Sequence, residues 1–224
     1  MCFTCVTKCS QGSFEKRILT GGIMIKSALL RSILFVMAGA LLPSFAFAHS
    51  GAGHAGIGEA SGFMLGLTHP SSGLDHVCAM LAVGLWAAQM GGRAVWAVPL
   101  TFVGVMALGG VFQILGISLP FVEQGIVLSV LLLGVLIAAS VRLPLLLGSG
   151  IVGLFALWHG HAHGAEMPAL ASGIEYALGF MLATASLHAI GIAFGLGMQR
   201  MARERLVHFA GAGIALCGVY LEVT

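Results

Sequence analysis

Charged side chains are scarce in this 224-residue sequence. Lysine and arginine together number 10 and aspartate and glutamate 8, so charged residues make up 8% of the chain, while hydrophobic residues make up 58%. Soluble domains typically carry about 25% charged and about 45–50% apolar residues. This composition leaves no room for a sizeable soluble domain, and it indicates an integral membrane protein embedded in the lipid bilayer.

Other absences exclude further classes of protein. The formal net charge is only +2 and the basic residues are scattered, which excludes a nucleic-acid-binding surface. The sequence contains no GxxxxGK[ST] motif, so nothing indicates nucleotide use. Cys2, Cys5 and Cys9 lie close together but have no histidine or further cysteine nearby, and Cys78 and Cys217 fall in apolar segments. We predict neither a metal-binding site nor a disulfide from these cysteines.

The first 48 residues are predicted to be absent from the mature protein. Residues 24–48 have the basic start and apolar run of a signal peptide, and Ala46-Phe47-Ala48 fits its cleavage site, so the mature chain is predicted to begin at His49. The alternative is a retained first transmembrane helix. Residues 1–23 form a polar preface that signal peptides seldom have, and we predict that translation starts at Met24.

Six apolar segments follow in residues 49–224, which we expect to form one membrane-embedded permease domain. A membrane-spanning helix needs about 20 mostly apolar residues, so the sequence predicts an all-α fold, a polytopic membrane helix bundle of about six transmembrane helices. The segments are 74–90, 94–117, 121–141, 143–163, 169–197 and 206–223. Turn residues separate them, and an additional apolar piece, 60–69, is too short to cross.

The arginines predict how this bundle is oriented. They fall in the first, third and fifth loops between the segments, at Arg93, at Arg142, and at Arg200, Arg203 and Arg205. Cytoplasmic loops carry an excess of basic residues, so we expect these three loops in the cytoplasm and both ends of the mature chain outside. A cleaved export signal requires the same orientation.

Histidines and carboxylates are concentrated in two short stretches, and the first is THPSSGLDH. It contains His69, Asp75 and His76 at the start of the first span. The proline after His69 should interrupt any helix there, and Ser72 could then cap the next helix. Asp75 could be the carboxylate of the same capping box. A cap needs no histidine, however, and ionisable residues near membrane depth are costly, so we favour a functional site.

The second stretch, WHGHAHGAE, ends the fourth span. If this span stays helical, His159, His163 and Glu166 share one face within about 60°, whereas His161 points nearly the other way. Imidazole and carboxylate ligands suit divalent transition metals. The alternative is a solvated outer loop. Because an even number of crossings separates the two stretches, we expect both on the outer side, where they can form one metal site.

Three further histidines are weaker candidates. His188 falls deep in the fifth span, where it could lie on an ion path or simply hydrogen-bond across helices. His49 and His54 would begin the mature chain, where they could capture metal weakly or have no role.

The two motifs resemble those of the HupE/UreJ family of small bacterial membrane proteins. HPSSGLDH matches its H-x5-D-H pattern and WHGHAHGAE matches F-H-G-x-A-H-G-x-E, with Trp158 in place of phenylalanine. The resemblance covers the chain from about His49 to its end. It implies a multi-pass protein of the bacterial inner membrane with a periplasmic mature N-terminus, linked functionally to a nickel hydrogenase or urease. By the same pattern, the metal ligands would be His69, Asp75, His76, His159, His163 and Glu166.

The resulting hypothesis is a secondary transporter that takes up Ni²⁺, or Co²⁺, for nickel-enzyme maturation. The metal would be its substrate, and we expect no prosthetic group and no enzymatic activity. Two alternatives stay open from the residues alone. One is an intramembrane hydrolase with a catalytic Zn²⁺, which Ser71 or Ser72 could assist. The other is a metal-binding accessory subunit that does not transport.

Overall fold

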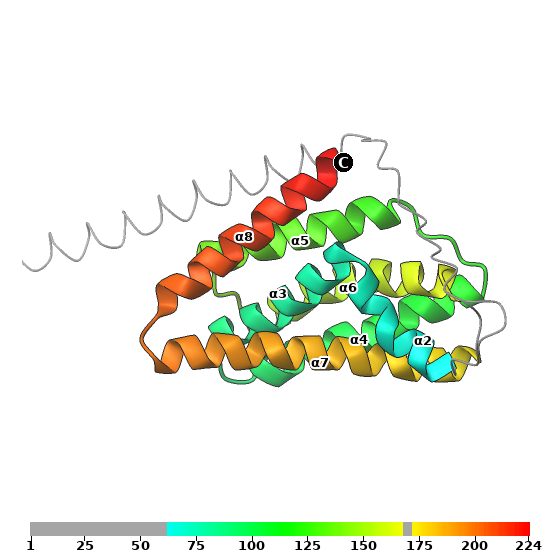
Figure 1. Cartoon of the computed structure of the whole chain (residues 1–224), viewed down its shortest axis with the longest axis horizontal. Helices are drawn as coiled ribbons and strands as arrows, with labels where there is room; N and C mark the ends of the chain where they lie inside the picture. Colours follow the sequence, from blue (N-terminus) through cyan, green and yellow to red (C-terminus); the bar gives the residue numbers. More distant parts are fainter. Residues whose placement is uncertain (1–61, 168–171) are drawn as a thin grey trace, which may run out of the picture. The chain divides into compact units, whose positions relative to one another are not determined.

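A computed structural model describes residues 62–167 and 172–224, and the regular secondary structure of these residues is helical, with no strand among them. The predicted signal peptide, the upstream segment 1–23, His49 and His54 lie outside the described residues. The elements are α2 (Gly62–Thr68), the 3-10 helix η1 (His69–Ser72), α3 (Leu74–Met90), α4 (Ala94–Ile114), α5 (Val122–Ala138), α6 (Leu145–Ala165), α7 (Gly173–Arg200) and α8 (Glu204–Val223) (Figure 1).

The helix ends agree with the predicted segments to within a few residues, since turn residues stop the helices. α3 spans 74–90 as predicted, and Gly91 follows it with a positive φ of 75° that glycine adopts without strain. α5 ends at Ala138, three residues earlier than predicted, because Ser140 takes a left-handed conformation (φ 52°). α6 continues to Ala165, two residues beyond the prediction, and carries all three histidines of the second stretch in helical form, with Glu166 directly after its last residue.

α3 is the central helix of the bundle. It packs against α4, α5, α7 and α8, while α4 pairs with α6, α5 with α8 and α2 with α7 (Figure 1). Glycines allow the backbones to approach closely, as is usual for helices in membranes. A Cβ added to Gly160 of α6 would overlap the carbonyl oxygen of Met106 on α4, and one added to Gly84 of α3 would overlap that of His188 on α7. These close crossings fix the helices that carry the histidines.

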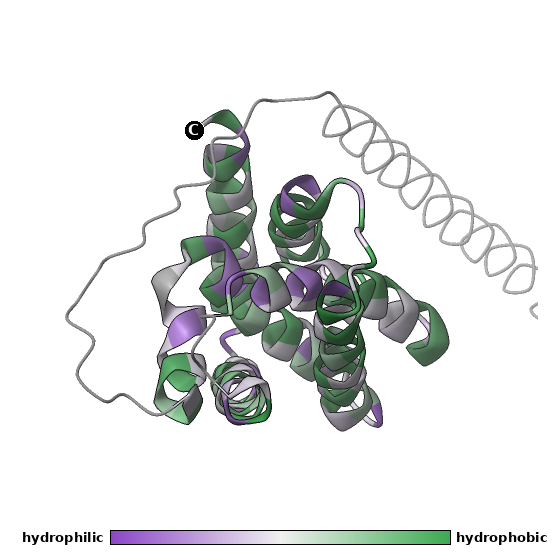
Figure 2. Ribbon diagram, turned by 90° about the vertical axis from the view of Figure 1, so that its right-hand side faces the viewer, coloured by the Kyte–Doolittle hydropathy of each residue, from purple (hydrophilic) through white to green (hydrophobic). Residues whose placement is uncertain are grey.

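The outer faces of the bundle are apolar. Leu100, Leu146, Ile174 and Phe209 are each more than 60% exposed, and apolar residues dominate the helices (Figure 2). Such extensive exposed apolar surface is typical of contact with lipid. Among the described residues, four helices are long and apolar enough to cross a membrane, namely α4, α6, α7 and most of α8, whereas α3 and α5 have 17 residues each. The fold is that of a multi-pass membrane protein.

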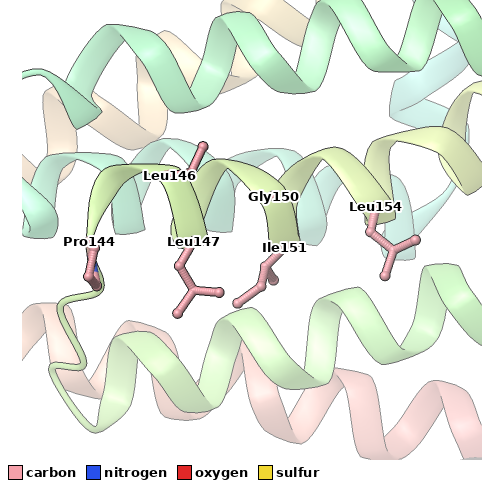
Figure 3. Close-up of a pocket in the computed structure, with 6 residues that line it drawn as sticks. All are labelled: Pro144, Leu146, Leu147, Gly150, Ile151 and Leu154. Carbon is pink, nitrogen blue, oxygen red and sulfur yellow. The ribbon is translucent and has the colours of Figure 1, made fainter.

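One apolar surface pocket lies on the first half of α6. It has a volume of about 520 Å³ and is lined by Pro144, Leu146, Leu147, Gly150, Ile151 and Leu154. Figure 3 shows Leu147, Ile151 and Leu154 on one side of the helix. Its lining offers no side-chain metal ligand, and the histidines lie on the second half of α6.

Candidate metal centre

The first histidine stretch lies at the break between α2 and α3. α2 ends at Thr68, and η1 begins at His69 with Pro70 in its first turn. Gly73 then adopts an extended conformation (φ −110°, ψ 123°), and α3 begins at Leu74. The proline and the extended glycine therefore separate His69 from the first turn of α3, so that the two come from different elements.

Asp75 orients the ring of His76 in the first turn of α3. Its Oδ1 accepts hydrogen bonds from the backbone N–H of His76 at 2.8 Å and from the ring Nδ1 of His76 at 2.8 Å. A Cβ at Gly73 would lie 2.5 Å from this oxygen, so glycine makes room for the pair. The alternative in which Ser72 caps this helix does not hold, because Gly73, which has no side chain, occupies the N-cap position.

His76 and His159 offer the same ring nitrogen. The Nδ1 of His159 donates to the carbonyl oxygen of Phe155 at 3.0 Å, so the proton of each ring sits on Nδ1 and the lone pair on Nε2. Both Nε2 atoms are buried, and neither has a hydrogen-bond partner within the described part of the chain. Histidines that bind metals are held in this manner, with the other ring nitrogen donating to a carboxylate or a carbonyl.

The two histidine stretches contact each other at His163. Its ring centroid lies 4.9 Å from that of His69 and 4.3 Å from that of His76, and the His76 centroid lies 5.1 Å from that of His159. Glu166, the C-cap residue that follows α6, joins the same group. Its Oε2 is 2.7 Å from Nε2 of His69 and 3.8 Å from Nδ1 of His163. All six residues of the predicted site are therefore adjacent. We call the four rings and the Glu166 carboxylate the outer cluster.

Exposure falls along the outer cluster. The side chain of Glu166 is 52% exposed and that of His69 24%, whereas His163 is 2% exposed and His159 is fully buried. One ligand atom each from His69, His163 and Glu166 all lie within 4.8 Å of one another, a spacing that allows a shared ion. The cluster runs from an accessible carboxylate into the interior of the bundle.

Aromatic side chains enclose the outer cluster, and the sequence did not reveal them. Phe180 packs on His163 with ring centroids 4.0 Å apart, and Tyr176 lies 5.7 Å from His69. Phe102 lies beyond His159 at 5.4 Å. Aromatic residues in apolar helices carry no local signal of a site, because the same residues serve ordinary packing.

The other described histidines lie apart from this cluster. His161 points away, as predicted: its Nε2 is 3.1 Å from the carbonyl oxygen of Ile117 and 3.3 Å from the backbone nitrogen of Leu119, in the α4–α5 loop. His188 of α7 is 1% exposed and meets Phe102, with ring centroids 5.0 Å apart. The remaining one, His208 of α8, bonds to Ser140 at 2.6 Å.

Charges are distributed unevenly between the two ends of the described bundle. The start of α3, the end of α6 and the start of α7 meet at the outer cluster. The Sγ atom of Cys78, near the start of α3, lies 3.6 Å from that of Cys217, near the end of α8. The end of α8 therefore lies on the same side of the bundle. The helix termini at this end bear five acidic residues, Asp75, Glu123, Glu166, Glu175 and Glu222. The opposite termini and their loops bear Arg93, Arg142, Arg200, Arg203 and Arg205, together with Glu204. The outer cluster thus lies at the acidic end, where cations are attracted.

Comparison with known proteins shows the family of the chain. Residues 36–221 match the family model described as HupE / UreJ protein. The chain is also 46% identical over 193 residues to Protein HupE of Rhizobium leguminosarum bv. viciae, an alignment that covers 85% of this chain and 97% of the relative. No solved structure matches the chain significantly. On this evidence the chain belongs to the HupE/UreJ family.

Proposed function

We propose that this protein is a permease of the bacterial inner membrane that takes up Ni²⁺, or Co²⁺, from the periplasm for the maturation of a nickel hydrogenase or urease. The outer cluster would receive the ion from the periplasm. The choice of nickel follows from the family resemblance, because imidazole and carboxylate ligands alone bind Cu²⁺ more strongly than Ni²⁺.

The observation that carries the proposal is the pair of buried, unpartnered Nε2 atoms of His76 and His159. A buried polar atom without a partner costs about 1–3 kcal/mol, and ion binding would remove that cost. Each ring is already held by a hydrogen bond at Nδ1. Lone pairs that are oriented before the ion arrives lose little entropy when they bind it.

The spacing of the rings fits shared ions. A ligating imidazole nitrogen lies about 2.1 Å from its metal and the ring centroid about 1.1 Å further, so two rings at right angles around one ion have centroids about 4.5 Å apart. The three neighbouring pairs of rings in the outer cluster are separated by 4.3, 4.9 and 5.1 Å. An ion could therefore move inward from one pair of ligands to the next without being fully coordinated at any one site, and conduction requires such weak binding.

The direction of transport follows from the charges. With six crossings and the arginine-bearing loops in the cytoplasm, the acidic end and the outer cluster face the periplasm. A divalent ion that moves inward through 100 mV gains about 4.6 kcal/mol. The membrane potential is therefore a sufficient driving force.

Transport is tested in proteoliposomes that contain the purified protein. An imposed inside-negative potential should drive accumulation of ⁶³Ni²⁺, and collapse of the potential should abolish it. Liposomes that carry the protein and bind ⁶³Ni²⁺ at their surface without potential-dependent accumulation would instead identify an accessory metal-binding subunit. Hydrolysis without ion flux would identify the hydrolase alternative.

A further inference from the structure

Two cysteines that are far apart in the sequence contact each other at the acidic end of the bundle. The Sγ atoms of Cys78 on α3 and Cys217 on α8 are 3.6 Å apart, so the two sulfur atoms touch. Both residues are free thiols and both are partly exposed. A disulfide bond holds its sulfur atoms about 2.05 Å apart, and a small movement of the two side chains would therefore join them.

α8 is the least enclosed of the long helices. Of the four described helices that are long enough to cross a membrane, it has the smallest buried share. Leu216 and Tyr220, on either side of Cys217, are 69% and 59% exposed. His208 bonds to Ser140 at 2.6 Å near the start of α8, whereas the cysteine pair lies near its end. A covalent bond at Cys217 would therefore hold the second end of this peripheral helix.

Cys78 lies on the opposite side of α3 from His76. Two positions along an α-helix correspond to a rotation of about 200°. Accordingly, His76 contacts His159 and His163 of α6, whereas Cys78 contacts Cys217 of α8. A bond between the cysteines would therefore hold the first turns of α3 without entering the space between the histidine rings.

The place of the pair along the helices determines which redox compartment it meets. α3 begins at Leu74 and α8 ends at Val223, so Cys78 and Cys217 lie about 6 Å and about 9 Å from those helix ends. Both ends belong to the acidic end of the bundle, which faces the periplasm in the proposed orientation. Disulfides form and persist in the bacterial periplasm, whereas the cytoplasm keeps thiols reduced.

We propose that Cys78 and Cys217 form a disulfide bond after export, and that this bond attaches α8 to α3. The inference rests on the orientation given under the proposed function. The oxidant is a disulfide of the periplasm. The thiolate of one cysteine attacks it, which leaves a mixed disulfide and releases one thiol of the oxidant. The second cysteine attacks the mixed disulfide, forms the new bond and releases the other thiol. The two cysteines lose two electrons and two protons, and the oxidant gains them as its two thiols.

The first test measures the state of the two thiols in cells. Cells that express the protein are quenched with acid and alkylated in denaturing detergent without reductant, and the peptides are analysed by mass spectrometry. Cys78 and Cys217 should escape alkylation in at least nine-tenths of the chains until dithiothreitol is added, and their peptides should be linked within one chain. The control is Cys217→Ser, in which Cys78 should be alkylated fully. Alkylation of both cysteines in most wild-type chains before reduction would overturn the proposal.

The second test uses purified protein oxidised with glutathione disulfide or reduced with dithiothreitol. Oxidation should raise the Tm of wild type by at least about 5 °C, because the bond closes a long loop, and should leave the Tm of the Cys78→Ser/Cys217→Ser double variant unchanged. Equal Tm values for oxidised and reduced wild type would contradict the attachment of α8.

The two tests together separate the disulfide from the proposed function. A pair that glutathione disulfide oxidises in purified protein but that stays reduced in cells would refute the native disulfide, and with it the periplasmic orientation of this end. A pair that is oxidised in cells, in a protein that transports no ⁶³Ni²⁺, would support the disulfide and refute the transport function.

Discussion

The Nδ1 of His76 donates to Oδ1 of Asp75 at 2.8 Å, and this hydrogen bond leaves the lone pair of the ring on Nε2. The same carboxylate oxygen also accepts the backbone N–H of His76. Asp75 therefore acts on the ring as an orienting group, whereas the sequence motif alone made it a candidate ligand equal to His69 and His76. Carboxylates in this position hold the tautomer and raise the basicity of the ligating nitrogen.

Removal of the Asp75 carboxylate should weaken nickel binding without abolishing it. Groups that orient a ligand typically change metal affinity 10–100-fold, so Asp75→Ala should raise the Kd for Ni²⁺ by about that factor. Asp75→Asn should have a smaller effect, because its amide oxygen can still accept from His76. Equilibrium dialysis with ⁶³Ni²⁺ measures both. An unchanged Kd in Asp75→Ala would show that the hydrogen bond does not matter for binding.

Glu166 should govern how ions enter the outer cluster. Its carboxylate is half exposed and contacts the most accessible histidine, His69. Glu166→Gln should raise the KM for Ni²⁺ uptake severalfold and change the maximal rate little, since the buried rings stay in place. Glu175→Gln is the control, because Glu175 is an exposed carboxylate of the same acidic end. If the two substitutions had equal effects on KM, Glu166 would act only through its negative charge and not through its contact with His69.

Gly160 should be required for the close packing of α6 on α4. A Cβ there overlaps the carbonyl oxygen of Met106, and overpacking of this kind typically costs about 1–3 kcal/mol. Gly160→Ala should therefore lower the Tm of the purified protein and reduce uptake, because the adjacent His159 is displaced. Gly150→Ala on the same helix meets open space, and its Tm should be unchanged or slightly higher. A Tm in Gly160→Ala equal to that of wild type would contradict the described crossing.

The packing of α3 on α8 can be tested by cross-linking. The sulfur atoms of Cys78 and Cys217 lie 3.6 Å apart, although 138 positions separate the two residues in sequence. Mild oxidation of membranes should join the two cysteines within one chain, which mass spectrometry of the linked peptides detects. Cys78→Ser should show no such product. If Cys217 cross-links only between chains, the α3–α8 contact is wrong.

Much of the helix arrangement could be predicted from the sequence, because turn residues stop the helices locally. Gly91-Gly92 and Leu119-Pro120 stand between helices, as predicted, and α3 begins and ends at the predicted residues. The proximity of the two histidine stretches was also predicted, since the number of crossings between them fixes the membrane side. The crossing number itself stays part of the functional proposal, as α3 and α5 are short.

What the sequence could not provide depends on contacts between helices. The N-cap of α3 is Gly73 rather than Ser72. A Cβ at position 73 would crowd Asp75 and His76, so glycine is needed there. The position of Phe102 between His159 and His188 arises from the packing of α4 against α6 and α7. Neither feature has a local sequence pattern, so only the three-dimensional arrangement reveals it.

The most direct measurement is ⁶³Ni²⁺ uptake by proteoliposomes that carry His76→Ala, His163→Ala or His161→Ala, with the amount of folded protein matched by size-exclusion chromatography. His76 and His163 belong to the outer cluster, whereas His161 belongs to the same helix and motif as His163 but contacts the α4–α5 loop. The proposal predicts that His76→Ala and His163→Ala lose at least nine-tenths of uptake, whereas His161→Ala retains most of it. A tenfold loss corresponds to about 1.4 kcal/mol of free energy. Equal uptake by all three variants would contradict it.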